Sequence, residues 1–284
     1  MFDLNKLKKI EFVLFDVDGT LVDDSGEIGE RTKQLIMDLK KLGVLFSFAS
    51  GRLHSALIPL ANELKIYSPL ISLDGSAIKS LTSKYFVYRS FLKQSQVKKA
   101  IEYSEQYLLN IALCHTEAIY YTEQNSVIPK LIDKFGATYT EVNSYDDLTT
   151  ETLEIVFAGD NRRAVEFVRD KLSFPFTVGT SLSFFRSQTH DGIYYLEVRR
   201  SGSSKGKAMQ RLLKYLKIKE TRTAVLGDWY NDISLFKSKG IKVAVSNAIP
   251  ELKKSADYVL DKSNNEEGAA EFLEALLEAK NSQL

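Results

Sequence analysis

Short, uninterrupted apolar runs alternate with helix-type patterns in the N-terminal third of the chain. The runs are Phe12 to Phe15, Val44 to Ala49 and Pro69 to Leu73. Runs of this length, rich in aromatic and aliphatic residues, are typical of strands that are buried on both faces. Between them, Glu30 to Leu42 carries leucine and isoleucine at helical spacing before Gly43, and a second helix pattern continues through Leu64. The alternation of strands and helices predicts right-handed crossovers and a parallel sheet.

The same alternation returns toward the C-terminus. The predicted elements are a helix over Lys205 to Leu216, a strand over Thr223 to Leu226, a helix over Asn231 to Lys239 ended by Gly240, a strand over Ile241 to Val245, and a last helix from Glu267 to Ala279. We therefore assign residues 1–90 and 200–284 to one α/β domain, in which a Rossmann-like parallel sheet has helices on both faces.

The middle of the chain has longer strand candidates in which apolar and polar residues alternate. These strands are Ile111 to Thr122, Leu153 to Ala158, Thr177 to Arg186 and Ile193 to Val198, and helix patterns cover Gln96 to Tyr107, Val127 to Phe135 and Arg162 to Lys171. Alternation indicates a mainly antiparallel sheet with one face covered by helices. We interpret residues 91–199 as a separate α+β domain inserted into the first, with Arg199 to Ser204 as the returning hinge.

Composition narrows the classes of function. The 284-residue chain has 44% hydrophobic and 26% charged residues, as soluble globular proteins do. A formal net charge of +1 predicts no binding to nucleic acid or to an anionic membrane. A single cysteine, Cys114, excludes an internal disulfide, and we expect it to be a buried apolar residue. Asp16 interrupts the first apolar segment too early for a signal peptide, so we expect a cytoplasmic protein.

Two carboxylates follow the first predicted strand, in the sequence Phe-Asp-Val-Asp-Gly-Thr-Leu that begins at Phe15. Ligands of open α/β sheets bind just beyond the carboxyl ends of the strands. Because like charges so close resist ionising together, Asp16 and Asp18 favour a cation between them. Mg²⁺ fits, since it binds one or two carboxylates and shares its remaining positions with water and phosphate oxygens. Taken alone, the same residues also fit a strand that ends in a solvated Asp-Gly turn.

Further polar segments fall at the same predicted sheet edge. They are Ser50-Gly51, Lys205 at the start of a helix, and the run from Gly227 through Asp228, Asn231 and Asp232. Together they supply acids, a hydroxyl, backbone N–H groups and an ammonium, which is the equipment that phosphoryl transfer needs. These segments also have simpler explanations. Ser50 could cap a helix, Lys205 could be an ordinary lysine in the first turn of a helix, and Asn231 and Asp232 could be an N-cap pair. Only their joint placement favours chemistry.

This constellation resembles the haloacid dehalogenase superfamily, with the strongest match to its Cof-type sugar-phosphatase group. That group carries a large α/β cap between its second and third motifs. The resemblance covers nearly the whole chain and extends to Val245-Ser246-Asn247-Ala248, Ala256-Asp257-Tyr258-Val259 and residues 264–268. It implies that residues 91–199 form a cap that would close over the leaving group and supply specificity.

The resemblance also implies a role for each residue of the four segments. Asp16 would attack phosphorus and form an aspartyl-phosphate, while Asp18 would donate a proton to the leaving oxygen and later accept one from water. The carboxylates of Asp16 and Asp228, with the backbone carbonyl of Asp18, would bind Mg²⁺. Ser50 and the N–H of Gly51 would bind phosphate, and Lys205 would neutralise charge on the nucleophile and the phosphate. Asn231 would contact phosphate or hold the groups around the metal. Asp232 would act mainly by orienting the metal's ligands without binding the metal directly.

Two departures from the group concern its motif loops. Asp74-Gly75-Ser76 stands where the group usually has Asn-Gly-Ala, and an acid there would alter recognition or have no consequence. Trp229 and Tyr230 bring two aromatic rings into a loop that often has smaller residues. They would stack on a sugar or narrow the entrance, but packing beneath the cap is the simpler interpretation.

Side chains outside the motifs are weaker candidates. In the cap, Arg186, His190 and Asp191 lie near a predicted turn and are candidates to face substrate. His54 and His115 have no motif around them, and we expect structural roles for both.

The predicted activity is a Mg²⁺-dependent phosphatase for small phosphorylated metabolites, with sugar phosphates as the default substrate. A phosphomutase of the same superfamily is the nearest alternative, and a non-catalytic metabolite sensor on this fold is a second. A dehalogenase fits less well, because its chemistry does not use the metal that Asp18, Asp228 and Asp232 imply. We expect a monomer or weak homodimer.

Overall fold

The computed structural model describes residues 2–83, 85–132, 136–187 and 190–282. It divides into two compact units. The core unit holds the chain up to Gly51, then Leu57–Tyr88, and then the chain from Ser204 onward. The inserted unit holds Arg52–Ala56 and Arg89–Ser203.

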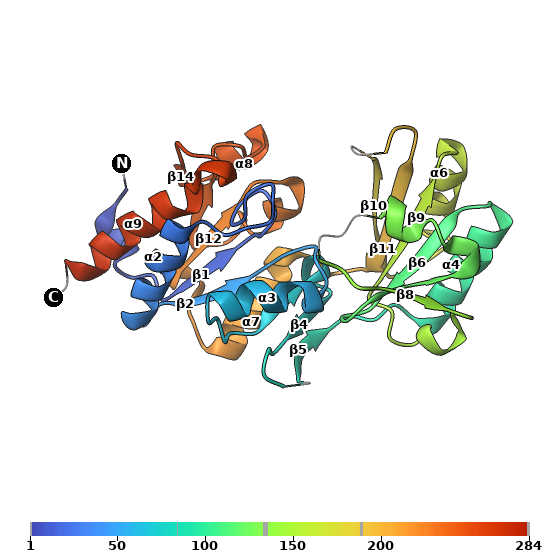
Figure 1. The fold of residues 1–284 in the computed structure, drawn as a ribbon, viewed down its shortest axis with the longest axis horizontal. Helices are drawn as coiled ribbons and strands as arrows, with labels where there is room; N and C mark the ends of the chain where they lie inside the picture. The colour runs from blue at the N-terminus through green and yellow to red at the C-terminus, as the bar shows by residue number, and fades with distance from the viewer. Residues whose placement is uncertain (1, 84, 133–135, 188–189, 283–284) are drawn as a thin grey trace. The chain divides into compact units, whose positions relative to one another are not determined.

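A five-stranded parallel sheet forms the centre of the core unit, in the order β14-β13-β12-β1-β2. Its strands are β1 Phe12–Phe15, β2 Leu45–Phe48, β12 Thr223–Gly227, β13 Ile241–Ala244 and β14 Tyr258–Val259. Strands from opposite ends of the sequence lie side by side here, because β1 pairs with β12 (Figure 1). Phe15 is opposite both Leu226 and Phe48, so the three central strands end at nearly the same level. This register brings the residues that follow them to one edge.

Helices complete the core unit. They are α1 Leu4–Leu7, α2 Glu30–Lys41, α7 Lys205–Leu216, α8 Pro250–Ser255, α9 Gly268–Asn281 and most of α3 His54–Glu63, whose start up to Ala56 groups with the inserted unit. All residues of β1 and β12 are buried, as strands covered on both faces must be. Helices α2 and α9, from the two ends of the chain, pack on each other and contribute Leu35, Leu39, Leu273 and Leu276 to one hydrophobic core.

The third predicted strand joins a different sheet. Strand β3 Leu70–Ser72 belongs to a three-stranded sheet with β4 Ala77–Lys79 and β5 Phe86–Arg89, and it pairs antiparallel with β4. Its link to the parallel sheet is a single parallel bridge between Ala49 and Ile71, so the predicted parallel relation is present but short. Left-handed residues after β3 turn the chain straight back into β4, and the strand's remaining pairing is that of a hairpin.

The predicted helix over residues 231–239 is replaced by a 3₁₀ segment, Tyr230–Ser234, followed by turns. The Asp232 side chain accepts hydrogen bonds from the backbone N–H groups of Asp228 and Trp229 and so caps the start of this segment. Beyond it, the N–H groups of Leu235 and Ser238 bond to carbonyls three residues earlier, which is the 3₁₀ and turn pattern and not that of a continued α-helix.

The inserted unit is a six-stranded sheet in the order β10-β11-β9-β6-β7-β8, antiparallel except between β7 and β8. Its elements are α4 Gln94–Gln106, β6 Asn110–Cys114, β7 Ile119–Thr122, α5 Ile128–Leu131, β8 Tyr139–Val142, β9 Glu154–Gly159, α6 Arg162–Lys171, β10 Thr180–Arg186 and β11 Tyr194–Arg200. A second hydrophobic core joins α4 and α6 to this sheet. The predicted fold class, a parallel α/β core with an inserted, mainly antiparallel α+β unit, is confirmed.

Two predicted elements of the inserted unit have different bounds. The single strand predicted over Ile111 to Thr122 is the hairpin β6–β7, closed by a bond from the N–H of His115 to the carbonyl of Ala118. Of the helix predicted over Val127 to Phe135, Ile128–Leu131 is helical, and residues 133–135 lie outside the described residues. Across the described ranges of both units, no helix combines the length and hydropathy needed to cross a membrane.

Candidate active site

Asp16 begins the site, directly after β1. Its N–H donates to the carbonyl of Leu226 on β12, which continues the strand pairing by one residue and fixes the start of the loop. The residue is only 4% exposed, whereas Asp18 is exposed. Gly19 then turns the chain with φ +75°, and a Cβ there would lie 2.5 Å from Oδ2 of Asp228. Backbone angle and crowding both require glycine at this turn.

Ser50 and Gly51 follow β2 at the same sheet edge. The N–H of Ser50 donates to the carbonyl of Ile71, and the carbonyl of Ser50 accepts from the N–H of Asp74. Ser50 is fully buried. Because α3 begins only at His54, Ser50 is not at that helix's cap position.

Lys205 opens α7, whose N-cap is Ser204. The lysine is 1% exposed, and its Nζ lies 2.6 Å from Oδ1 of Asp16 and 2.7 Å from Oδ1 of Asp232. Burial by itself would lower the pKa of Lys205, but the charges of Asp16, Asp232 and Asp74 outweigh it and raise that pKa well above its usual range. The ammonium therefore stays protonated at any physiological pH, although it stands at a helix terminus that disfavours cations.

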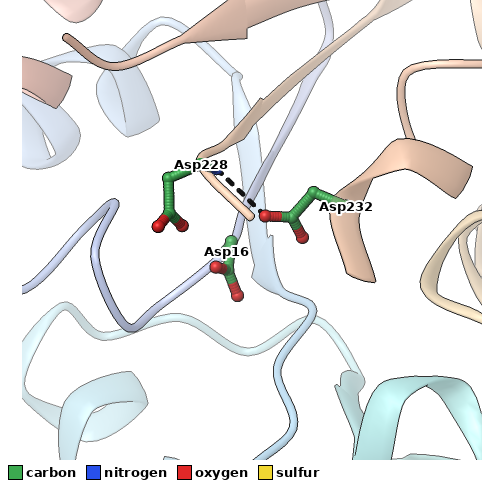
Figure 2. Close-up of side chains that lie close together, drawn as sticks. All are labelled: Asp16, Asp228 and Asp232. Atoms are coloured by element: carbon green, nitrogen blue, oxygen red, sulfur yellow. Dashed lines mark hydrogen bonds between the residues drawn. The ribbon is translucent and has the colours of Figure 1, made fainter. Parts of the chain in front are cut away.

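Asp228 and Asp232 complete a cluster of carboxylates with Asp16 (Figure 2). Oxygens of these three residues lie within 4.8 Å of one another. The Thr20 hydroxyl donates to Oδ1 of Asp228 at 2.9 Å. Burial, and next the charge of Asp232, raise the pKa of Asp228 to about 6. The same two causes raise the pKa of the Asp16 carboxyl well above its ordinary value.

The cluster fits a divalent cation. One ammonium cannot balance the three buried carboxylates beside it, and the raised pKa values of Asp16 and Asp228 express the excess negative charge. Asp232 is already engaged on both oxygens, since Oδ1 accepts from Lys205 and Oδ2 accepts from two backbone N–H groups. Its hydrogen bonds match the supporting position predicted for it better than a place among the ligands.

Asn231 lies in the 3₁₀ segment and is exposed. Its Nδ2 donates to Oδ1 of Asp74 at 3.0 Å, a pair that the sequence analysis did not foresee. Next to it, Trp229 and Tyr230 are 46% and 56% exposed, with their rings edge to face at 5.4 Å. Their contact with a sugar, their narrowing of the entrance and their packing beneath the cap stay predictions.

Two other contributors were missed. The Asn247 amide donates to the carbonyl of Gly19 at 2.8 Å, and the Asn264 amide donates to the carbonyl of Val22. Both therefore tether the loop that carries Asp18. Both residues lie in the C-terminal segments that resemble the family, which was the available signal for a role at the site. However, no local sequence pattern predicts that an amide contacts a loop more than 200 residues away.

The weaker candidates lie in or near the inserted unit. Arg186 pairs with Asp191 at the β10–β11 turn, which also holds His190, and their contact with substrate stays a prediction. Cys114 is buried in β6, as expected. His54 is buried at the start of α3. The half-buried ring of His115 lies near the carbonyl of Leu148, and burial lowers its pKa.

Comparison with known proteins gives a consistent result. A sequence profile of the haloacid dehalogenase-like hydrolases matches residues 13–273. The 5-amino-6-(5-phospho-D-ribitylamino)uracil phosphatase YwtE of Bacillus subtilis is 26% identical in a gapped alignment of 286 positions that spans 93% of this chain and 97% of YwtE. Phosphatase YwpJ of the same species is 24% identical in a gapped alignment of 296 positions that spans 94% of this chain and 100% of YwpJ.

A solved structure leads to the same family. A haloacid dehalogenase-like hydrolase from Bacteroides thetaiotaomicron aligns with a TM-score of 0.78 and 26% identity, covering 93% of this chain and 98% of that one. Since the family profile spans most of the sequence and the relatives are phosphatases, the chain belongs to the haloacid dehalogenase-like hydrolases, in their Cof-type group, and is a phosphoric monoester hydrolase.

Proposed function

We propose that the protein is a Mg²⁺-dependent phosphatase for small phosphorylated metabolites, with sugar phosphates as the default class, and that it works through an aspartyl-phosphate on Asp16. The observation that carries this proposal is the buried ammonium of Lys205, which contacts Asp16 and Asp232 beside Asp228. A lysine held in this way lowers the pKa of the nucleophile against the effect of burial, and it offers positive charge where phosphoryl oxygens would gather.

The proposed reaction has two displacements. A carboxylate oxygen of Asp16 attacks phosphorus, the bond from phosphorus to the ester oxygen breaks, and Asp18 gives its proton to that leaving oxygen. Asp18 then takes a proton from a water molecule, whose oxygen attacks phosphorus and displaces Asp16 as a free carboxylate. Inorganic phosphate leaves, and both acids regain their starting states.

Other residues of the site hold the reacting groups. Ser50 and the N–H of Gly51 would bind the phosphoryl oxygens, and Asn231 would contact them or the metal's shell. Asp16, Asp228 and the carbonyl of Asp18 would hold Mg²⁺, which adds positive charge opposite the phosphoryl group when it is bound. Asp232 would keep Lys205 and the Asp228 loop in place, as its hydrogen bonds suggest.

The substrate class rests on the relatives together with the site. YwtE is named for a phosphorylated ribitylaminouracil, which carries its phosphate on a polyol chain. At 26% identity this supports a small phosphorylated metabolite for the present chain without selecting one.

Replacing the nucleophile tests the proposal. We expect Asp16→Asn to lower Mg²⁺-dependent hydrolysis of p-nitrophenyl phosphate by at least about 10³-fold, since the covalent route is lost. Phosphate release is measured with and without chelator, and circular dichroism and thermal melting establish that the variant is folded. Asp38→Asn, at a partly exposed position of α2 outside the site, is the matched control and should keep full activity. Full activity in Asp16→Asn would overturn the mechanism.

A further inference from the structure

Three consecutive residues after β3 have left-handed backbone angles. They are Leu73, Asp74 and Gly75, with φ of +47°, +49° and +94°. Glycine takes such angles freely, and Gly75 also lies against the carbonyl of Ser204, where a Cβ would come within 2.4 Å. Leucine and aspartate do not, and each costs on the order of 1–3 kcal/mol in this region. Strained residues that persist in a fold often serve a site.

The strained turn places Asp74 among the motif segments. Its N–H donates to the carbonyl of Ser50 at 3.0 Å, and its Oδ1 lies 3.5 Å from the point where a Cβ on Gly51 would stand. Oδ1 also accepts from Nδ2 of Asn231 at 3.0 Å. Its charge further contributes to the raised pKa of Lys205. Asp74 therefore interacts with three of the four motif segments, although it belongs to none of them.

A carboxylate fixes the orientation of the amide that it contacts. An ionised carboxylate only accepts hydrogen bonds, so the Asn231 amide must turn its nitrogen toward Asp74 and its oxygen away. The asparagine expected here from the group's Asn-Gly-Ala sequence could either donate or accept, and would leave both orientations of Asn231 open. A bond to a charged acceptor is also stronger than one between neutral groups.

We propose that Asp74 is a positioning residue for Asn231: its carboxylate sets the amide so that the Asn231 oxygen, and not its NH₂ group, is available to hydrogen-bond donors such as water in the shell of a bound divalent cation. The inference rests on the proposed function and narrows the role of Asn231 from the two that the sequence left open. Asp74 itself contacts neither the phosphoryl group nor the metal in this assignment.

A double-mutant cycle tests this assignment. Its variants are Asp74→Asn, Asn231→Ala and the pair together, with Asp38→Asn as the surface control. Mg²⁺ affinity is measured by calorimetric titration of each protein without substrate, and kcat and KM by phosphate release at saturating Mg²⁺. Loss of partners that orient metal ligands typically weakens metal affinity or activity 10–100-fold. We expect Asp74→Asn to weaken Mg²⁺ binding about tenfold and to leave KM nearly unchanged.

Coupling decides the outcome. If Asp74 acts through Asn231, the double variant binds Mg²⁺ no more weakly than Asn231→Ala alone. Additive losses, or Mg²⁺ affinity in Asp74→Asn equal to that of the unsubstituted protein, would overturn the assignment. Asn231→Ala leaves the strained turn untouched, so unaltered Mg²⁺ affinity in that variant would overturn it even if Asp74→Asn fails to fold. Absence of phosphatase activity in the unsubstituted protein would instead defeat the proposed function, while the Mg²⁺ titrations would still decide the coupling.

Discussion

At the scale of single residues, the site is governed by an imbalance of charge. Lys205 is the buried cation in contact with Asp16 and Asp232, and Asp228 adds a third carboxylate within the same few ångströms. Burial and mutual repulsion make full ionisation of the cluster costly. A second cation relieves that cost, so the cluster should couple metal binding, pH and stability.

The Asp228→Asn substitution tests how the charge of the cluster makes stability depend on pH in the metal-free protein. The pKa of Asp228 rises from 3.8 to about 6 on folding, so the folded state binds more protons than the unfolded state between those pH values. The free energy of unfolding of the unsubstituted protein therefore falls as pH rises through this window. The Asp228→Asn variant does not show this fall, because asparagine does not ionise. We expect the variant to gain stability over the unsubstituted protein between about pH 4 and pH 7, by on the order of 1–3 kcal/mol.

Urea unfolding in chelator at several pH values measures this gain. Asp38→Asn is a control with the opposite sign, because hydrogen bonds from Lys41 and Gln34 lower the pKa of the partly exposed Asp38 carboxyl. Saturating Mg²⁺ should reverse the ranking, since the aspartate then contributes a ligand that asparagine replaces poorly. A gain for Asp228→Asn that is the same at every pH would refute the argument.

At the scale of elements, the start of α7 is positioned by close backbone packing. Gly206 follows Lys205, and a Cβ on it would lie 2.1 Å from the carbonyl oxygen of Ser234. The N–H of Gly206 also donates to the Ser234 hydroxyl. These contacts hold the start of α7, which carries Lys205, against the 3₁₀ segment that carries Asn231 and Asp232.

Gly206→Ala should separate these two segments. The methyl group meets backbone and not a flexible side chain, so the helix start has to shift and Lys205 moves away from Asp16. We expect a loss of about 1–3 kcal/mol in the free energy of unfolding and at least a tenfold fall in kcat. Lys207→Ala, one residue on and exposed, is the matched control and should change neither. Normal kcat in Gly206→Ala would show that the contact does not position the lysine.

The sequence predicted elements where local pattern decides the structure. Buried runs identified β1, β2 and β12, and because parallel strands end at one edge, Asp16, Ser50 and Asp228 could be placed together. Prediction from the sequence failed where contacts between distant residues determine the local structure. Asp232 reaches back to the backbone N–H groups of the metal-site loop, and the Asp74–Asn231 pair joins positions 157 residues apart. No periodicity carries such information.

At the scale of the whole molecule, the two units have separate hydrophobic cores. The core unit draws its cluster from residues 7–78 and 208–279, so it needs both ends of the chain. The inserted unit draws its cluster from residues 92–198, a continuous stretch. The three carboxylates of the cluster, those of Asp16, Asp228 and Asp232, all belong to the core unit.

Mg²⁺ should therefore act on one unit of the two. A ligand stabilises only the part whose folding creates its site, by about 2.7 kcal/mol at 100 times its Kd. For a unit of this size that shift is about 5–10 °C in Tm. We expect differential scanning calorimetry to resolve two transitions, of which Mg²⁺ raises one. Asp228→Asn should abolish the shift, and amide hydrogen exchange should place the added protection in β1 and β12 and not in β6 or β9. Equal protection of both units would mean that they unfold as one cooperative body, and the separation of the two cores would then have no thermodynamic consequence.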